Sequence, residues 1–320
     1  MVNKKNDGIQ IQYYKTLDVL KYVLAILIVS VHCNLFEENV LLHNFYLHVV
    51  ECAVPTFFCI SAFLFFRKII DNPNEGKMKF LHSIKRLFTL YGIWIVLMLP
   101  ISIPEFFMKA TFKEILYVIP FRSSFSVYWF IKALIINVSL IYFLRKHLFA
   151  CALISSLIYF YFAFDYIYGN LSDRIHPYYA FFYHTYAFVF GALIAKYEND
   201  LPNCFNNKYI IMVALVIVFI FSFIGNCRVV SKLLYPILLT LLALKTSVKI
   251  GFSKCRNMRT DSILFYMIHF SLVYIITQKF QIQIISVFRF MIVLTLLLII
   301  CAFYRFLERK TGAKFLRYLR

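Results

Sequence analysis

Three ionisable residues interrupt an otherwise apolar stretch near the start of the chain: Asp18, Lys21 and His32. On an α-helix, Lys21 and His32 are three turns plus about 20° apart, so their side chains share one face, about 16 Å apart along the axis. Asp18 precedes Lys21 by three residues, which is close enough for an ion pair. A histidine on this face can take a proton from a hydroxyl group, and a lysine can hold an anion.

This charged stripe has two interpretations. Inside a membrane-spanning helix, ionisable groups are costly unless they face a polar interior, so a shared face indicates a functional pathway. Alternatively, Asp18 and Lys21 extend to one membrane interface and His32 rests at the other. The topology derived below favours a polar pathway, because residues that only anchor the helix ends have no need to share one face.

The composition is that of an integral membrane protein. The chain is 62% hydrophobic and 19% aromatic, only 15% of its residues are charged, and its mean hydropathy is +0.76. A soluble domain of this length does not have such a composition. No polar stretch is long enough for a separate soluble domain. We therefore expect one transmembrane domain over 1–320, with a polar tail at 1–14 and a basic tail at 307–320.

Ten apolar runs predict an all-α, polytopic fold with about ten transmembrane helices. Basic residues concentrate in alternate linkers between the runs, which places both termini in the cytoplasm. The segment 104–125 is then the longest external linker, and its start could lie along the membrane surface. Pro236 could kink the eighth run. The runs are 17–36, 44–66, 86–103, 126–144, 149–168, 177–197, 208–225, 232–248, 260–280 and 284–306.

The net charge of +19 does not by itself indicate a nucleic-acid partner. The basic residues form short clusters between apolar runs, as in cytoplasmic loops of membrane proteins. The cysteines fall mostly inside the apolar runs and form no C-x-x-C pair, so we expect neither a disulfide framework nor a metal site.

Two motifs resemble acyltransferase family 3, a family of integral membrane acyltransferases. The first helix of that family reads L-D-x-L-R/K with a later histidine, and here L-D-V-L-K at 17–21 is followed by His32. The second helix of the family carries V-P-x-F-F-x-x-S-G-F, and residues 54–63 read V-P-T-F-F-C-I-S-A-F. Ala62 thus replaces the family's glycine.

Looser similarities extend the resemblance over about residues 14–310. They are a basic stretch at 84–91, the pair Trp129-Phe130, the pair Phe190-Gly191, and S-x-x-x-Y-x-x-H at 262–269. The family's R-x-x-R is incomplete, because Thr89 stands where the second arginine is expected.

The resemblance implies transfer of an acyl group, commonly acetyl, from a cytoplasmic thioester donor such as acetyl-CoA to a hydroxyl group. His32 would be the general base, since a neutral histidine suits proton transfer near pH 7. Lys21 and Arg86 would hold the phosphates of coenzyme A, and Asp18 would orient or neutralise Lys21. The alternatives are a structural histidine in the core and an Arg86 that only flanks a helix at the cytoplasmic side.

Three further residues are candidates for the site. Glu51 enters the second predicted helix from the outer side, at about the depth of His32. It could orient the His32 imidazole, or it could be a solvated acid at a helix start. Trp129 could stack on a sugar acceptor or belong to the interfacial aromatic belt. His269, and less so His184, could serve polar gating or contact the donor substrate, although a hydrogen-bonded core histidine is the more ordinary role for either.

The sequence therefore predicts a multi-pass inner-membrane O-acetyltransferase that acts on a surface polysaccharide or a lipid-linked glycan. Its expected partners are an acyl-CoA donor, the glycan acceptor and the lipid bilayer, with no nucleic acid and no metal. The main alternative is a transporter or flippase of a lipid-linked sugar, in which the charged stripe forms the substrate path. A purely structural membrane protein is the third possibility.

Overall fold

The structure is a computed structural model that describes residues 5–6, 9–10, 14–70, 73–106, 129–168, 182–225, 227–279 and 285–311. These residues are helical except for linkers and two paired two-residue strands, β1 (Lys5–Asn6) and β2 (Ile9–Gln10). The helices are α1 (Lys15–His32), α2 (Val40–Val50), α3 (Ala53–Ile70), α4 (Gly76–Phe106), α6 (Trp129–Phe143), α7 (Leu148–Tyr168), α9 (Thr185–Tyr197), α10 (Asn203–Asn206), α11 (Lys208–Phe221), α12 (Cys227–Lys245), α13 (Phe252–Tyr274) and α14 (Ser286–Thr311).

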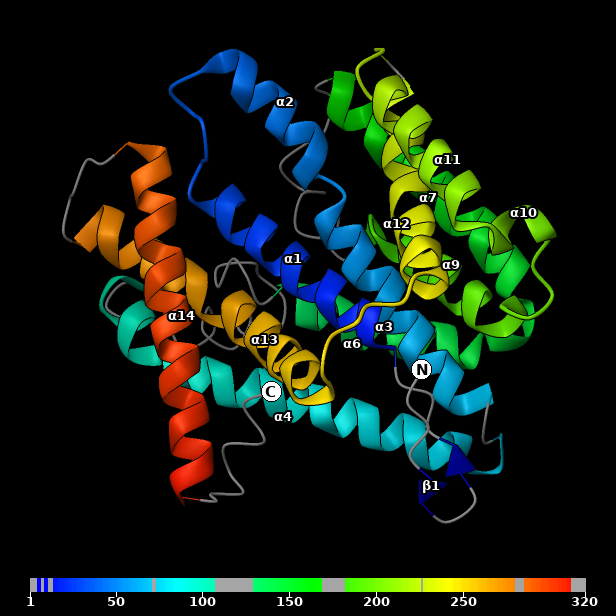
Figure 1. The fold of residues 1–320 in the computed structure, drawn as a ribbon, viewed down its shortest axis with the longest axis horizontal. Helices are drawn as coiled ribbons and strands as arrows, with labels where there is room; N and C mark the ends of the chain where they lie inside the picture. Colours follow the sequence, from blue (N-terminus) through cyan, green and yellow to red (C-terminus); the bar gives the residue numbers. More distant parts are fainter. Residues whose placement is uncertain are drawn as a thin grey trace.

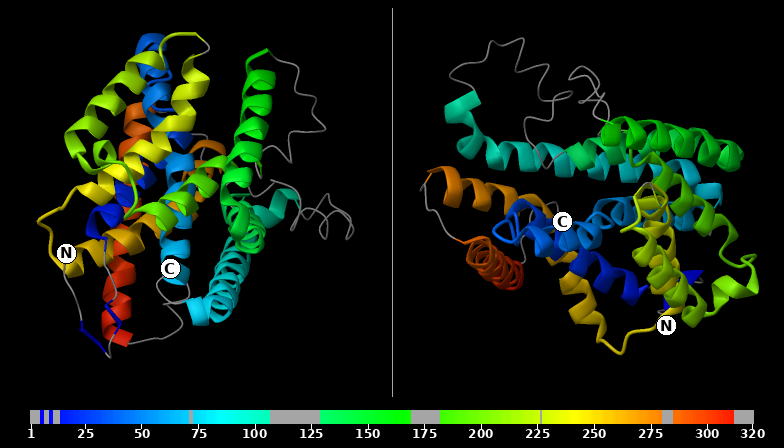
Figure 2. Two further views of the ribbon diagram at one scale, coloured as in Figure 1. Left: turned by 90° about the vertical axis from the view of Figure 1, so that its right-hand side faces the viewer. Right: turned by 90° about the horizontal axis from the view of Figure 1, so that it is seen from above.

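Short helical turns complete the described chain. They are the 3₁₀ segments η1 (Pro73–Glu75) and η2 (Arg145–His147) and a π-helical segment, η3 (Ile275–Lys279), that extends α13. In Figure 1, α14 lies at one end of the helical assembly, and α10 and α11 lie at the other. Figure 2 shows α4 and α7 along one side of it.

The predicted all-α fold is confirmed, and each of the ten predicted apolar runs overlaps a helix. Six helical segments are long and apolar enough to cross a membrane. The count of ten spans and the cytoplasmic location of both termini stay predictions. The external linker predicted at 104–125 lies almost wholly outside the described residues. The six segments are Val40–Ile70, Gly76–Leu97, Arg145–Phe164, Cys227–Lys245, Phe252–Thr277 and Ser286–Thr311.

The outermost helices expose apolar side chains where a soluble protein would expose polar ones. On α11 only Ile211 and Val218 are buried, whereas Ile210, Val213 and Ile217 are about half exposed. α14 likewise exposes a continuous row of large apolar side chains. A helix can keep such a surface because hydrocarbon, unlike water, does not penalise it, and all its backbone hydrogen bonds are internal. These faces fit a lipid environment.

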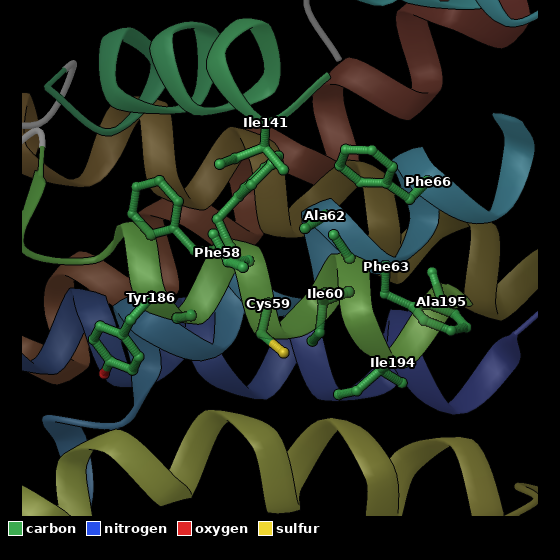
Figure 3. Close-up of a cluster of buried hydrophobic side chains, with 14 of the residues drawn as sticks. Phe58, Cys59, Ile60, Ala62, Phe63, Phe66, Ile141, Tyr186, Ile194 and Ala195 are labelled. Carbon is green, nitrogen blue, oxygen red and sulfur yellow. The ribbon is translucent and has the colours of Figure 1, made fainter. Parts of the chain in front are cut away.

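The core forms around α3, which is buried on most sides. Phe58, Ile60 and Phe63 are fully inaccessible to solvent, although they point in different directions around the helix. α9 packs along α3 and contributes Tyr186, Ile194 and Ala195 to the same cluster (Figure 3). A helix that is apolar all round belongs in the centre of a bundle. α3 is therefore the central helix, and the other elements of the site are placed relative to it.

Close packing of α3 and α9 depends on Gly191. A Cβ atom at Gly191 would lie 2.1 Å from the Cys59 carbonyl oxygen and 3.0 Å from the Ala62 Cβ atom. Because the first contact is with backbone, no side-chain rotation can relieve it. Glycine at 191 thus fixes the separation of the two central helices, and the small Ala62 side chain is compatible with that separation.

We predict that Gly191→Ala destabilises the protein by at least the 1–3 kcal/mol that is usual for an overpacked core. Melting temperature in detergent measures this effect. Gly92→Ala is the matched control, because a Cβ atom at Gly92 would meet nothing within 4 Å. Alanine is the better helix former, so Gly92→Ala should keep or slightly raise the melting temperature. Equal melting temperatures for both variants would contradict this account of the α3–α9 contact.

Candidate active site

α1 and α13 lie side by side and run in the same direction (Figure 1). Asp18 and Arg259 join them near their N-terminal ends, and His32 and His269 join them nearer their C-terminal ends. Lys21 and His32 are therefore at opposite ends of one helix pair, about 16 Å apart by helix rise. This places a charged end and a histidine end on the same interface.

At the charged end, Asp18 forms ion pairs with cations from both helices. Its carboxylate is 2.8 Å from the Lys21 ammonium group, as the three-residue spacing predicts. The Arg259 guanidinium is 4.0 Å from the second carboxylate oxygen. The Asp18 side chain is buried, and its pair with Arg259 links α1 to α13.

Lys68 of α3 and Arg86 of α4 bring further positive charge to this end. Lys21 and Lys68 each lie within electrostatic reach of Arg86 and Arg259. We call Lys21, Lys68, Arg86 and Arg259 the basic cluster. Of its four cations, Lys21 and Arg259 share the single Asp18 carboxylate, so the cluster is suited to an anion with several charges, such as a phosphate ester. Lys68 and Arg259 were not singled out from the sequence.

At the histidine end, the ring of His32 lies beside the ring of His269, with centroids 4.9 Å apart. Phe270 contacts His32 edge-on at 5.6 Å. His32 is partly exposed, whereas His269 is fully buried. The two histidines, one from each helix, therefore form a pair in which His32 is the member that a substrate can reach.

The hydrogen bond of His269 determines its tautomer. Its Nδ1 atom is 2.8 Å from the Phe265 carbonyl oxygen. A carbonyl oxygen only accepts, so Nδ1 carries the proton and Nε2 keeps its lone pair in the neutral ring. Nε2 is buried and has no hydrogen-bond partner among the described residues. A buried acceptor without a partner is costly, which points to a hydrogen bond formed with the neighbouring His32.

The loop after α1 fixes the end of the helix that carries His32. The backbone amide of Phe36 donates to the Ser286 hydroxyl oxygen at 3.0 Å, and the Glu38 carboxylate accepts from the hydroxyl and amide of Ser286. These bonds from Ser286 hold the pKa of the exposed Glu38 below its usual range. Glu37 adds an ion pair with Arg289 on α14. The loop thus ties the end of α1 to the start of α14.

Contacting aromatic rings connect the histidine pair to Trp129. The ring centroid of Tyr266 lies 6.0 Å from that of His269 and 5.2 Å from that of Phe130. The ring centroids of Phe130 and Trp129 are 6.4 Å apart. Trp129 in turn stacks on His184 at 5.7 Å. We call this series the aromatic row; its members are His32, His269, Tyr266, Phe130, Trp129 and His184. The row connects Trp129, which the sequence suggested for acceptor binding, to His32 through a series of packed rings.

The structure does not bring Glu51 to His32. Glu51 lies at the break between α2 and α3, where its carboxylate accepts from the Arg228 guanidinium at 3.1 Å and pairs with the Lys232 ammonium at 2.9 Å. Both cations belong to α12. The order of the apolar runs placed Glu51 at about the depth of His32, but it did not predict the direction of the Glu51 side chain around the helix. We therefore do not propose that Glu51 orients the His32 imidazole.

The arrangement supports a specific kind of chemistry. A basic cluster can hold a phosphate-bearing molecule at one end of α1 and α13, and a histidine at the other end can move a proton. Such an arrangement suits a molecule that is charged at one end and reactive at the other.

Comparison with protein families agrees with this chemistry. The family model of acyltransferase family 3, described as an acyltransferase domain, matches residues 14–305. Searches of curated proteins and of solved structures returned no match to the chain. The matched region includes the basic cluster, the histidine pair and Trp129. The chain therefore belongs to acyltransferase family 3, and it is a multi-pass membrane acyltransferase.

Proposed function

We propose that this acyltransferase moves an acetyl group from cytoplasmic acetyl-CoA to a hydroxyl group of a surface polysaccharide or a lipid-linked glycan, in the cell inner (cytoplasmic) membrane. The observation that supports it most is the arrangement along α1 and α13, with the basic cluster at one end and the His32–His269 pair at the other. In this proposal the basic cluster is at the cytoplasmic side, in keeping with the concentration of Lys and Arg in that set of linkers.

The reaction requires one proton to be moved twice. The acceptor hydroxyl attacks the thioester carbonyl carbon while the neutral His32 imidazole takes the hydroxyl proton. The tetrahedral intermediate then collapses, the carbon–sulfur bond breaks, and the departing thiolate of coenzyme A takes the proton back from the imidazolium. His32 returns to its neutral form, and the products are the ester and free coenzyme A.

Trp129 supports the glycan part of the proposal. It is partly exposed and lies on the aromatic row that starts at His32. Sugar rings stack on indole faces because their C–H groups are apolar. A glycan bound to Trp129 would thus lie at the far side of the aromatic row from the histidine pair.

An isotope-transfer experiment separates this proposal from the transporter alternative. Membranes that contain the protein are incubated with acetyl-CoA labelled in the acetyl group, and the glycan and lipid fractions are extracted. We expect an ester label that mild alkali removes, at a level well above membranes without the protein. A transporter of a lipid-linked sugar would move its substrate across sealed vesicles and leave no label in either fraction.

We also predict that the Nε2 lone pair of His269 positions the reacting groups. His269→Asn keeps a donor near the Phe265 carbonyl oxygen but removes the acceptor at Nε2, and should lower kcat by about 10-fold or more. His269→Gln places an amide oxygen near the Nε2 position and should restore much of the rate. Both kcat values are measured at saturating donor, with melting temperature as the fold control. If Asn and Gln variants have the same kcat, the lone pair has no such role.

A further inference from the structure

The ion pairs of Glu51 form a second charged group, separate from the basic cluster. Arg228 and Lys232 lie one turn apart on α12 and both bind the Glu51 carboxylate. The side chains of Arg228, Lys232 and Glu51 are 35%, 22% and 23% exposed, so a ligand can reach them. We call these three residues the outer triad.

The outer triad carries an excess of positive charge and unused donors. Two cations share one carboxylate, and the structure gives neither cationic side chain another acceptor among the described residues. Lysine has three N–H donors and arginine has five, so most of them are available. An arrangement of this kind attracts an anion more strongly than a balanced ion pair does.

Two histidines near the outer triad each have a ring nitrogen that makes no hydrogen bond to a described residue. His48 lies within electrostatic reach of all three residues, and His184 within reach of Lys232. The Nδ1 atoms of both histidines are buried and have no hydrogen-bond partner among the described residues. Buried nitrogens without partners next to surplus cations are expected where a ligand supplies the missing bonds.

His184 connects the outer triad to the aromatic row. Its ring lies against both Phe58 and Trp129, with centroid distances of 5.6 Å and 5.7 Å, and those two rings also contact each other. The row then continues through Phe130 and Tyr266 to His269 and His32. Since His184 touches Trp129 and lies within electrostatic reach of Lys232, a ligand with its sugar on Trp129 could hold an anionic group at Lys232.

We infer that the outer triad, with His184, is a subsite for the phosphate group of a phosphorylated acceptor. The ligand class is a sugar joined to a phosphate or diphosphate, either soluble or linked to a polyprenyl lipid. This inference rests on the proposed function, because it names the acceptor of the same reaction. It assigns Glu51 a role in tuning the charge of an acceptor site.

Binding of inorganic pyrophosphate and of polyprenyl diphosphate tests the inference. The full-length protein is placed in nanodiscs of phosphatidylcholine, and each probe is titrated at low salt, where charge interactions are least screened. Lys232→Gln should weaken binding by roughly tenfold, the usual effect of losing a bond to a charged group. The Lys232→Gln substitution should not displace α12, because the Tyr186 and Tyr159 hydroxyls donate to the backbone carbonyls of Lys232 and Val229, which the substitution leaves in place.

The two probes distinguish the possible sources of the phosphate. Binding of both with similar affinity indicates that the subsite recognises the phosphate of a soluble sugar phosphate. Much tighter binding of the polyprenyl diphosphate indicates a lipid-linked acceptor. Binding of neither probe would overturn the inference.

Glu51→Gln should change pyrophosphate affinity in the direction opposite to Lys232→Gln. Removing the carboxylate leaves both cations unpaired, so a phosphate subsite should bind pyrophosphate more tightly. If the triad only ties the α2–α3 junction to α12, Glu51→Gln and Lys232→Gln should both lower the melting temperature and neither should change pyrophosphate affinity. Arg145→Gln is the charge control, since Arg145 is exposed and stacks on Tyr142 away from the triad. An equal loss of affinity in the Arg145 variant would show nonspecific attraction and overturn the inference.

This test does not depend on acetyl transfer. If the wild-type protein transfers no label from acetyl-CoA but binds pyrophosphate through Lys232, the proposed function fails and the anion site stands. If it transfers acetyl groups and Lys232→Gln changes neither pyrophosphate affinity nor the KM for the acceptor, the function stands and the subsite fails.

Discussion

Replacing His32 with glutamine should lower acetyl transfer by a factor of about 10²–10⁴, the usual contribution of a positioned general base. Glutamine can form a hydrogen bond in place of the imidazole, but it cannot accept the proton of the acceptor hydroxyl. His32 is the partly exposed member of the histidine pair, so it is the member that the acceptor reaches. The loss should therefore appear in kcat rather than in binding of coenzyme A.

The test compares three properties of purified His32→Gln: transfer rate, coenzyme A affinity and melting temperature. We expect only the transfer rate to fall. His147→Gln is a control, because His147 is an exposed histidine in η2. A merely structural His32 would give the reverse pattern, with a lower melting temperature and normal activity per folded molecule. A well-folded variant with near-normal transfer would exclude His32 as the base.

Neutralising the basic cluster should have the second largest effect. Lys21→Gln and Arg259→Gln should each weaken coenzyme A binding by about 1–3 kcal/mol, because each removes a contact between a cation and a phosphate. Removing Arg86 should have a similar effect. Lys21→Arg keeps the charge and should be milder, although a guanidinium and an ammonium group differ in geometry.

Two comparisons make this prediction specific to the phosphates of the donor. Arg256→Gln removes a cation one turn earlier on α13, where the side chain is 51% exposed, and should leave affinity unchanged. A short acetyl thioester without phosphates should show the same kcat/KM with wild-type protein and with Arg259→Gln. Calorimetric titration and steady-state rates supply the values. Normal coenzyme A affinity in both Lys21→Gln and Arg259→Gln would remove the cluster from the donor site.

The part of the candidate site that lies on α1 could be predicted from helix geometry. The spacing of Asp18, Lys21 and His32 determines that they share one face, and the Asp18–Lys21 ion pair is present as expected. The motif at 262–269 singled out His269, but not its contact with His32. Arg259 and Lys68 could be read only as basic residues near helix ends. Which helices pack together depends on contacts such as that of Gly191 with Cys59, and a single sequence does not specify them.

Glu51 shows the limit of reasoning from depth in the membrane. The run 44–66 reads as one apolar span, but α2 ends at Val50 and α3 begins at Ala53. Glu51 falls at this break, where the direction of its side chain depends on the turn between the helices. Its partners lie on α12, far along the chain. Residue spacing could not have identified them.

The central claim is that one donor molecule lies along α1 and α13, from the basic cluster to the histidine pair. Cryo-electron microscopy of His32→Gln with acetyl-CoA tests it most directly, because this variant should bind the donor without consuming it. The account predicts phosphate density in contact with Lys21, Arg86 and Arg259, and thioester density beside residue 32. Donor density elsewhere, for example with its phosphates at Arg228 and Lys232, would contradict it.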